Sequence, residues 1–284
     1  MTKILNLIAA SAIATTAWVA SSAVQAQQEA TRSITHIAGG LYRAQNNFHY
    51  SVFLVTDEGI IATDPINREF AEWLKAEMAK RFDQPVRYVV YSHSDADHTT
   101  GGEVFADTAT FVGHAASVPI FEASGHSPAP TVTFEDRMDL TLGGKTVELI
   151  FPGPSHTNNL IAMRFPEERA LFMVDLVSVK RLPFQTLPHY HIPGAIEALK
   201  NIEALDYDIL VTAHGPNGVP ADVTVEKEYL EALLAQVSAA REEGLSVAQA
   251  QARISLPDYA DWGFYEAWLP LNVEGMYRIL DEAE

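Results

Sequence analysis

The chain of 284 residues contains no cysteine. It can therefore form no disulfide, although an oxidising compartment would permit one. It also has no thiol that could act as a nucleophile. A lipid-modified bacterial N-terminus, which requires a cysteine, is excluded as well.

Basic residues are scarce. The chain has 19 Lys and Arg against 37 Asp and Glu, a formal net charge of −18. A surface of this charge repels nucleic acid and anionic membranes, so we expect neither as a partner. The expected partner is a small-molecule substrate, whose nature the charge does not reveal. The hydrophobic share of 48% is still sufficient for a sizeable core.

Long apolar runs are missing except at the N-terminus. Lys3 precedes an apolar stretch from Ile4 to Ala20, and Val24-Gln25-Ala26 fits the small-x-small pattern for cleavage before Gln27. We predict a signal peptide over residues 1–26 and export to a bacterial periplasm. The alternative, a membrane anchor, is disfavoured because hydroxyl residues interrupt the run. Cleavage would leave 18 basic against 37 acidic residues, a net charge of −19, and no membrane-bound segment.

Strand-like runs and amphipathic helices alternate along the remaining chain. Strands are expected at residues 50–56, 59–64, 87–91, 109–112, 147–151, 159–165, 170–176 and 208–212. Helices are expected at residues 70–82, 196–205 and 225–241, and from about residues 102 and 272 onward. No linker separates these elements. They indicate one α/β (α+β) domain over residues 27–220 and a helical C-terminal extension over residues 221–284 that packs on the same domain.

The densest polar segment directly follows the strand expected at residues 87–91. His93, Asp95, Asp97 and His98 place four metal-type ligands within six residues. In a wholly extended segment, His93, Asp95 and Asp97 would share one face. A solvated polar loop could have the same composition, so this segment alone does not decide between the two interpretations.

Three more expected strand ends each carry a ligand of the same kind. His156 comes after the strand at 147–151, Asp175 lies toward the end of the strand at 170–176, and His214 follows the strand at 208–212. An unpaired carboxylate on an apolar strand would be costly to bury. The seven residues together favour a metal site over a polar loop.

This series resembles the metallo-β-lactamase-fold superfamily. The pattern of that superfamily is His-x-His-x-Asp-His, then a distant His, a distant Asp at a strand end, and a final His before Gly. The resemblance covers about residues 34–218 and implies a four-layer αββα sandwich with the site at one edge of the sheets. It implies a first metal on His93, Asp95 and His156, a second on Asp97, His98 and His214, and Asp175 as the bridge between them.

Asp64 stands where the superfamily places an aspartate that supports the site from behind. The alternative is that Asp64 is only a turn residue before Pro65.

Asp95 departs from the pattern, because it stands where the superfamily has its second His. Aspartate is a harder, negatively charged ligand. Two zinc ions are expected, but iron or manganese becomes possible at the first site. His93, Asp95 and His156 would also form a two-His-one-carboxylate set, which suits non-haem iron.

The resemblance implies hydrolysis by a metal-activated water, with Asp97 as the catalytic residue that orients the water and moves a proton. The absence of cysteine excludes the β-lactamase subclasses with a Cys ligand. A bridging Asp175 is more similar to glyoxalase II and lactonases than to the remaining subclass, which has Ser there. The expected function is a periplasmic hydrolase of a lactam, lactone, ester or thioester. The alternatives are an iron-dependent oxygenase or redox protein, or a catalytically weak metal-binding member.

Substrate contacts are expected from His189, Tyr190 and His191, where the superfamily places residues that line the cleft; a surface loop is the alternative. The other histidines are not expected to be ligands; they are His36, His49, His114 and His126. The aromatic residues between 257 and 270 are expected to pack on the core. Their alternatives are a roof over the cleft or the surface of a homodimer.

Overall fold

The structure is a computed structural model that describes residues 30–282. The predicted signal peptide, residues 1–26, lies outside the described residues. One compact unit begins at Thr31 and includes the rest of the chain. Within residues 30–282, no helix is both long enough and apolar enough to cross a bilayer.

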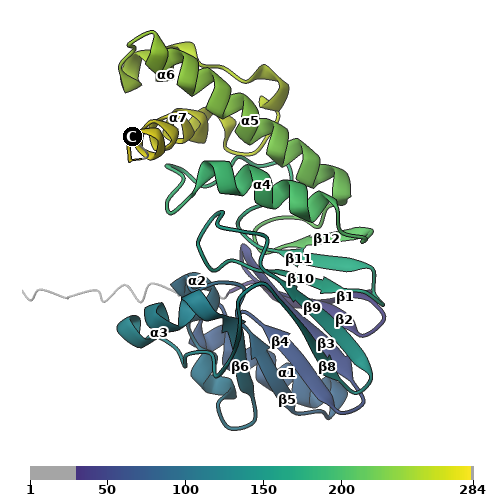
Figure 1. Ribbon diagram of the computed structural model, residues 1–284. Helices are drawn as coiled ribbons and strands as arrows, with labels where there is room; N and C mark the ends of the chain where they lie inside the picture. Colours follow the sequence, from purple (N-terminus) through teal and green to yellow (C-terminus); the bar gives the residue numbers. More distant parts are fainter. Residues whose placement is uncertain (1–29, 283–284) are drawn as a thin grey trace, which may run out of the picture. The chain divides into compact units, whose positions relative to one another are not determined.

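Two sheets form the centre of this unit (Figure 1). The first has the order β1-β2-β3-β4-β5-β6-β7, antiparallel from β1 to β4 and parallel from β4 to β7. Its strands are β1 (Arg32–Ala38), β2 (Leu41–Asn46), β3 (His49–Thr56), β4 (Gly59–Thr63), β5 (Val86–Val90), β6 (Thr110–His114) and β7 (Val132–Phe134).

The second sheet has the order β12-β11-β10-β9-β8 and is antiparallel except for the β11–β12 pair. Its strands are β8 (Arg137–Leu142), β9 (Lys145–Ile150), β10 (Ala162–Phe165), β11 (Ala170–Met173) and β12 (Ile209–Thr212).

The described helices are α1 (Arg68–Phe82), α2 (Ala96–Thr99), α3 (Val118–Ser124), α4 (Ile192–Glu203), α5 (Pro220–Glu242), α6 (Val247–Arg253) and α7 (Tyr265–Glu282). Three single turns of 3₁₀ helix are η1 (Gly102–Phe105), η2 (Ala115–Ser117) and η3 (Pro257–Tyr259).

Alternating side chains of the first sheet enter two different cores. On β3, Leu54 joins the core between the sheets, whereas Phe53 packs toward α1. On β5, Val90 and Val89 divide in the same way. This alternation follows from the two-residue period of a strand, and it leaves α1 as the outer layer of the first sheet.

Helices α4 and α5 pack on the outer face of the second sheet (Figure 1). Because this sheet is covered on both faces, all four residues of β11 are buried. The arrangement is the αββα sandwich that the resemblance implied, and this expectation is confirmed.

The last helix begins earlier than expected. It starts at Tyr265 rather than near Asn272, and Pro270 lies inside it. Proline cannot donate the helical hydrogen bond at this position. At the start of the helix, Phe264 and Trp268 stack with centroids 4.2 Å apart. The helix expected from residue 102 is only the single turn η1. Strands β1 and β2 were not expected, because their apolar residues do not alternate regularly.

Glu226 of α5 is a buried carboxyl group that accepts a hydrogen bond from the backbone N–H of Ser178 at 3.1 Å. Burial raises its pKa to about 8, against the smaller effects of that hydrogen bond and of the Arg181 charge. The native state therefore keeps Glu226 protonated at a pH where the unfolded chain has already ionised it.

We expect Glu226 to make the protein less stable as pH rises from about 4.5 to about 8, because only the unfolded chain releases the proton in that range. Glu226→Gln should remove this loss and stabilise the protein at pH 8, by up to about 4 kcal/mol. At pH 4.5 the two proteins should differ little. Urea denaturation at both pH values measures the effect, and an equal difference at both would contradict it.

Candidate metal centre

The strand ends bring the predicted ligands to one edge of the sandwich. His93 follows β5, His156 follows β9, Asp175 follows β11 and His214 follows β12. Asp175 has a left-handed backbone with φ 54°, which turns its side chain out of the strand direction. These four positions are the ones expected from the sequence.

The segment after β5 is not wholly extended, so the condition under which His93, Asp95 and Asp97 would share one face is not met. Residues Ala96–Thr99 form the short helix α2, with Asp95 at its N-cap. Consecutive residues of a helix point in different directions, so His98 is buried whereas the side chain of Asp97 is 55% exposed. Both still reach the cluster.

His93, Asp95 and His156 form the first group that could hold a metal ion. Asp95 Oδ2 lies 3.5 Å from His93 Nε2 and 3.4 Å from His156 Nε2. His98 and His214 approach each other on the other side, with their Nε2 atoms 3.2 Å apart. Asp97 Oδ2 lies 3.6 Å from His98 Nε2.

Asp175 lies between the two sets. Its Oδ2 is 3.3 Å from His93 Nε2 and 3.1 Å from His98 Nε2, while its Oδ1 is 2.9 Å from His214 Nε2. One carboxylate thus contacts members of both sets, which is the position required of a bridging ligand. The ligand roles themselves stay predictions.

The spacing of these atoms fits shared ions. Two ligands that each lie about 2.1 Å from one tetrahedral ion are roughly 3.4 Å apart. The buried Nε2 of His93 has no hydrogen-bond partner, although two carboxylates lie within 3.5 Å. A buried polar atom without a hydrogen-bond partner is rare in a folded protein. The residues present therefore fit a metal cofactor, and they include the groups of His and Asp side chains that could hold an ion.

Asp64 supports the site from behind. Its Oδ1 accepts from the backbone N–H of Ser92 at 2.8 Å, and its Oδ2 accepts from the Ser92 hydroxyl at 2.7 Å. The same Oδ2 lies 3.1 Å from His98 Nδ1. If His98 donates from Nδ1 to this carboxylate, Nε2 keeps its lone pair for a metal. Asp64 is fully buried, and this geometry favours support of the site over a mere turn residue.

The charges of the cluster are strongly coupled. Burial lowers the pKa of His93, but the carboxylates of Asp175 and Asp95 outweigh it and raise that pKa to about 9. Burial raises the pKa of Asp175, but the attraction of His98 and His214 holds it well below its ordinary value. The carboxylates therefore carry negative charge into a buried site, which attracts cations.

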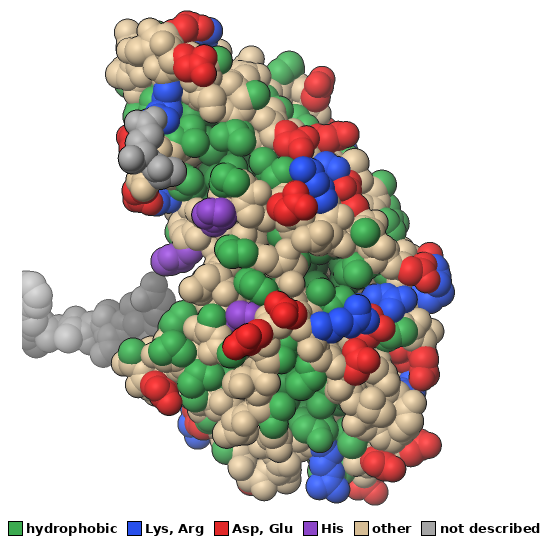
Figure 2. Space-filling model, viewed as in Figure 1, with side chains coloured by type: hydrophobic (Ala, Val, Ile, Leu, Met, Phe, Trp, Pro, Cys, Tyr) green, Lys and Arg blue, Asp and Glu red, His purple; other side chains and the backbone are tan. Residues whose placement is uncertain are grey.

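A cavity of about 560 Å³ opens above the cluster. Aromatic rings form much of its wall, and Arg181 is its one Lys or Arg side chain among the described residues. The lining includes His49, Asp95, Asp97, His156, Asp175 and His214 from the cluster side, and Phe48, Arg181, Phe184, Pro188, His189, Tyr190, Gly215, Phe264 and Trp268 around them. Figure 2 shows histidine side chains at the surface near exposed apolar ones.

Two of the three predicted substrate contacts line this cavity. His189 does so, and so does Tyr190, whose hydroxyl donates to the backbone carbonyl of Asp175 at 2.7 Å. His191 does not line it, because its Nδ1 accepts from the N–H of Gly194 and so caps α4. Contact of these residues with a substrate stays a prediction.

The C-terminal aromatics divide between two of their expected roles. Tyr259 and Trp262 are buried and contact Tyr229 of α5. Phe264 and Trp268 instead line the cavity. The extension therefore both packs on the core and forms a wall of the site.

His49 is the residue that the sequence interpretation missed. It was placed in a loop and given no ligand role, but it is the first residue of β3 and lies 3.4 Å from Asp97 (Nε2 to Oδ2). The strands expected at residues 50–56 and 59–64 could have indicated the position of His49. Because β3 is antiparallel to β4 and β4 is parallel to β5, β3 begins at the edge where β5 ends.

The other histidines take structural positions. His114 Nε2 lies 2.7 Å from the carbonyl of Glu135, and its Nδ1 accepts from the N–H of Ala116. His126 lies 2.6 Å from the hydroxyl of Thr99, and His36 lies 3.0 Å from the carbonyl of Gly39.

Residues 67–214, just over half of the chain, match the model of the metallo-beta-lactamase superfamily. The chain belongs to this superfamily, which supports a metal-dependent hydrolase or a related function. A metallo-beta-lactamase from Pontibacter korlensis has the same fold, with a TM-score of 0.64 and 21% identity over 71% of this chain and 99% of that one.

Two curated relatives show how widely the similarity extends. The chain is 26% identical over 187 residues to 2,4-dinitroanisole O-demethylase subunit alpha of Nocardioides sp. (strain JS1661), covering 63% of this chain and 56% of that protein. It is 25% identical over 134 residues to metallo-beta-lactamase type 2 of Elizabethkingia meningoseptica, covering 46% and 54%. The chain thus spans about half the length of the curated relatives it matches.

Asp64→Asn should weaken metal binding about 10- to 100-fold, because an amide nitrogen cannot accept from His98 Nδ1. Chelator competition with Zn²⁺ measures the affinity. Asp57→Asn, at an exposed turn, is the matched control and should bind like the wild type. Equal affinities in all three proteins would contradict the supporting role of Asp64.

Proposed function

We propose that the chain is a periplasmic, metal-dependent hydrolase that cleaves a lactam, lactone, ester or thioester bond of a small molecule. The observation that carries the proposal is the convergence of three carboxylates and four imidazoles beneath a cavity. These groups come from four separate segments of the chain and share spacings of 2.9 to 3.6 Å between nearest ligand atoms.

The residues favour zinc as the cofactor, with one ion on His93, Asp95 and His156 and the other on Asp97, His98 and His214. Two zinc ions bound there would supply an activated water and polarise the carbonyl group of the substrate. Asp175 would be the bridging ligand between the two ions. The hydroxyl of Tyr190 would fix the backbone of Asp175 through its hydrogen bond to the carbonyl.

Asp97 is suited to handle the proton. Its side chain is the most exposed of the cluster carboxylates and lines the cavity, so a substrate can reach it. Contacts with His49 and His98 restrict its orientation. Burial raises its pKa, but these histidines outweigh burial and lower the pKa, so Asp97 is ionised and able to accept a proton near neutral pH.

The side chains that line the cavity suggest the kind of substrate that it binds. Phe48, Phe184 and Phe264 are 84%, 50% and 56% exposed, and all three line the same cavity. Exposed aromatic groups that gather in one cavity favour a ring-containing ligand. Arg181, whose guanidinium lies 5.6 Å from the Trp268 ring, could receive an anionic or oxygen-rich substituent. The name of the Nocardioides relative, an aromatic O-demethylase, agrees with a ring-containing substrate.

The second candidate function is an iron-dependent oxygenase or redox protein, and Asp95 is the observation that favours it. His93, Asp95 and His156 form a two-His-one-carboxylate group of the kind that binds non-haem iron. A site with the negatively charged carboxylate of Asp95 also favours iron or manganese more than a site with three neutral imidazoles would.

Asp97→Asn should lower kcat/KM by a factor of about 100 or more on any substrate found in a screen of lactams, lactones, esters, thioesters and phosphodiesters. Asp139→Asn, on exposed β8, is the control and should leave activity unchanged. Metal content is measured in parallel, so that a loss of ions is not taken for a loss of proton transfer. Full activity of metal-loaded Asp97→Asn would refute the catalytic role.

Metal analysis separates the two functions. Protein purified without added metal should contain about two equivalents of zinc and consume no oxygen. One equivalent of iron, together with oxygen uptake on a thiol substrate, would overturn the hydrolase and support the oxygenase.

A further inference from the structure

We propose that His49 is a ligand of the second metal ion, in addition to Asp97, His98 and His214. His49 lies outside the superfamily's ligand pattern. The proposal concerns how the metal is held, and it extends the metal site on which the proposed function rests.

The backbone places His49 rigidly beside His214. The N–H of Tyr50, the next residue on β3, donates to the carbonyl of Ala213 at 2.8 Å. Arg43 Nη2 donates to the carbonyl of Thr212 at 2.8 Å and to that of Gly215 at 2.5 Å. Hydrogen bonds on both sides of His214 therefore hold its loop against the start of β3.

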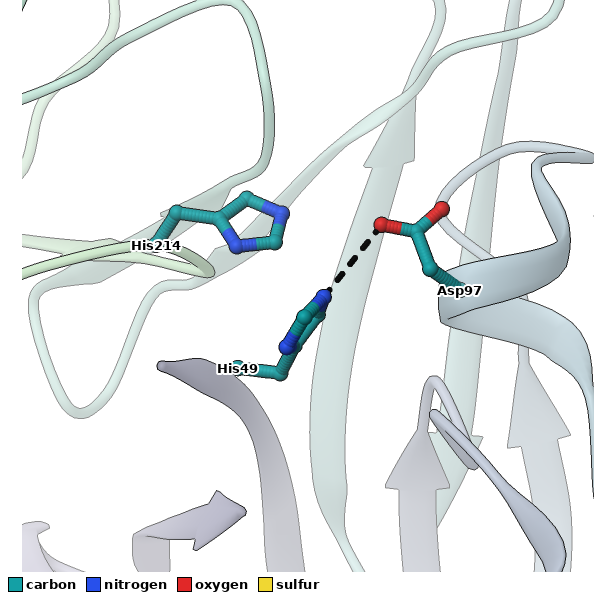
Figure 3. A group of neighbouring side chains, drawn as sticks. All are labelled: His49, Asp97 and His214. Carbon is teal, nitrogen blue, oxygen red and sulfur yellow. Dashed lines mark hydrogen bonds and ion pairs between the residues drawn. The ribbon is translucent and has the colours of Figure 1, made fainter. Parts of the chain in front are cut away.

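The side chains then converge on one point. His49 Nε2 and Asp97 Oδ2 lie 3.4 Å apart, and one ligand atom from each of His49, Asp97 and His214 lies within 4.8 Å of the other two. Figure 3 shows His49 and Asp97 facing each other across a gap, with the ring of His214 beside them. The rings of His49 and His214 meet edge to face, with centroids 4.6 Å apart.

A hydrogen bond from His49 to Asp97 explains this geometry less well than a shared ion does. The distance of 3.4 Å exceeds the 2.7–3.2 Å usual for N–H···O bonds. It matches neighbouring ligands of one five-coordinate ion, which lie roughly 3.0–3.6 Å apart when each is about 2.1 Å from the ion. The His93–Asp95 and His156–Asp95 distances, 3.5 and 3.4 Å, are the same within error. His49 therefore lies at the same distance from Asp97 as the predicted ligands of the first site, His93 and His156, lie from Asp95.

The consequence is that the two sites differ in chemistry. The second site would hold three imidazoles and one carboxylate besides the bridge, whereas the first holds two imidazoles and one carboxylate. Imidazole suits zinc and cobalt, and carboxylate shifts preference toward manganese and harder ions. His49 therefore makes the second site the nitrogen-rich one.

The test is metal binding to the metal-free full-length protein, in the wild type, His49→Ala and His49→Gln. His36→Ala is the matched control, because His36 is an exposed histidine on β1 of the same sheet, away from the cluster. Calorimetric titration with Zn²⁺ should show at least about tenfold weaker binding of one equivalent in both His49 variants, with the other equivalent unchanged. Two variants are used so that a packing defect in one is recognised.

Co²⁺-loaded protein gives a readout that a merely structural role would not change. Wild-type protein should show one more paramagnetically shifted imidazole N–H resonance than either His49 variant, and His36→Ala should match the wild type. An unchanged Co²⁺ spectrum and an unchanged titration in the His49 variants would overturn the proposal. Because neither measurement uses turnover, this outcome is distinct from a failure of the proposed hydrolysis.

Discussion

The carboxylate of Asp175 lies among four histidines at the end of a fully buried strand, with its side chain 14% exposed. An ionised group at such a depth is stable only when positive or hydrogen-bonding partners surround it. His93 and His98 supply that environment from the segment after β5, and His214 supplies it from the segment after β12. Their positions depend in turn on the sheet order, because strands distant in the sequence must end at one edge. The fold and the site are therefore linked through this one charge.

Support for the ligands extends beyond the residues that would bind the metal. Asp64 connects Ser92 with His98, Tyr190 holds the carbonyl of Asp175, and Arg43 holds the loop of His214. Each of these contacts fixes a ligand before any ion arrives. Preorganisation of this kind lowers the ordering that binding requires and sharpens the geometry of the site.

The layers, and the meeting of the seven candidate ligands at one edge of the sandwich, could be predicted from the sequence, because strand ends carried histidine or aspartate after apolar runs. The C-terminal part was harder. Pro270 indicated a helix boundary, but α7 continues through it, and Phe264 and Trp268 stack at the start of the helix. His49 was missed because it precedes its apolar run instead of following it, and the ligand pattern draws attention only to residues after strands. His191 was expected to line the cleft because it is a polar residue close to His189 and Tyr190. Only the structure shows that it is the N-cap of α4.

The polar floor and the aromatic wall of the cavity come from different parts of the chain. The floor is formed at the strand ends and by α2, whereas Phe264 directly precedes α7 and Trp268 belongs to it. Asn272 of that helix donates to the carbonyls of Pro183 and Gln185 on either side of Phe184. These hydrogen bonds connect α7 to the segment that contains Phe184, another aromatic residue of the wall. Substitutions in α7 or beside Phe184 can therefore change the shape of this part of the wall without replacing any residue of the floor.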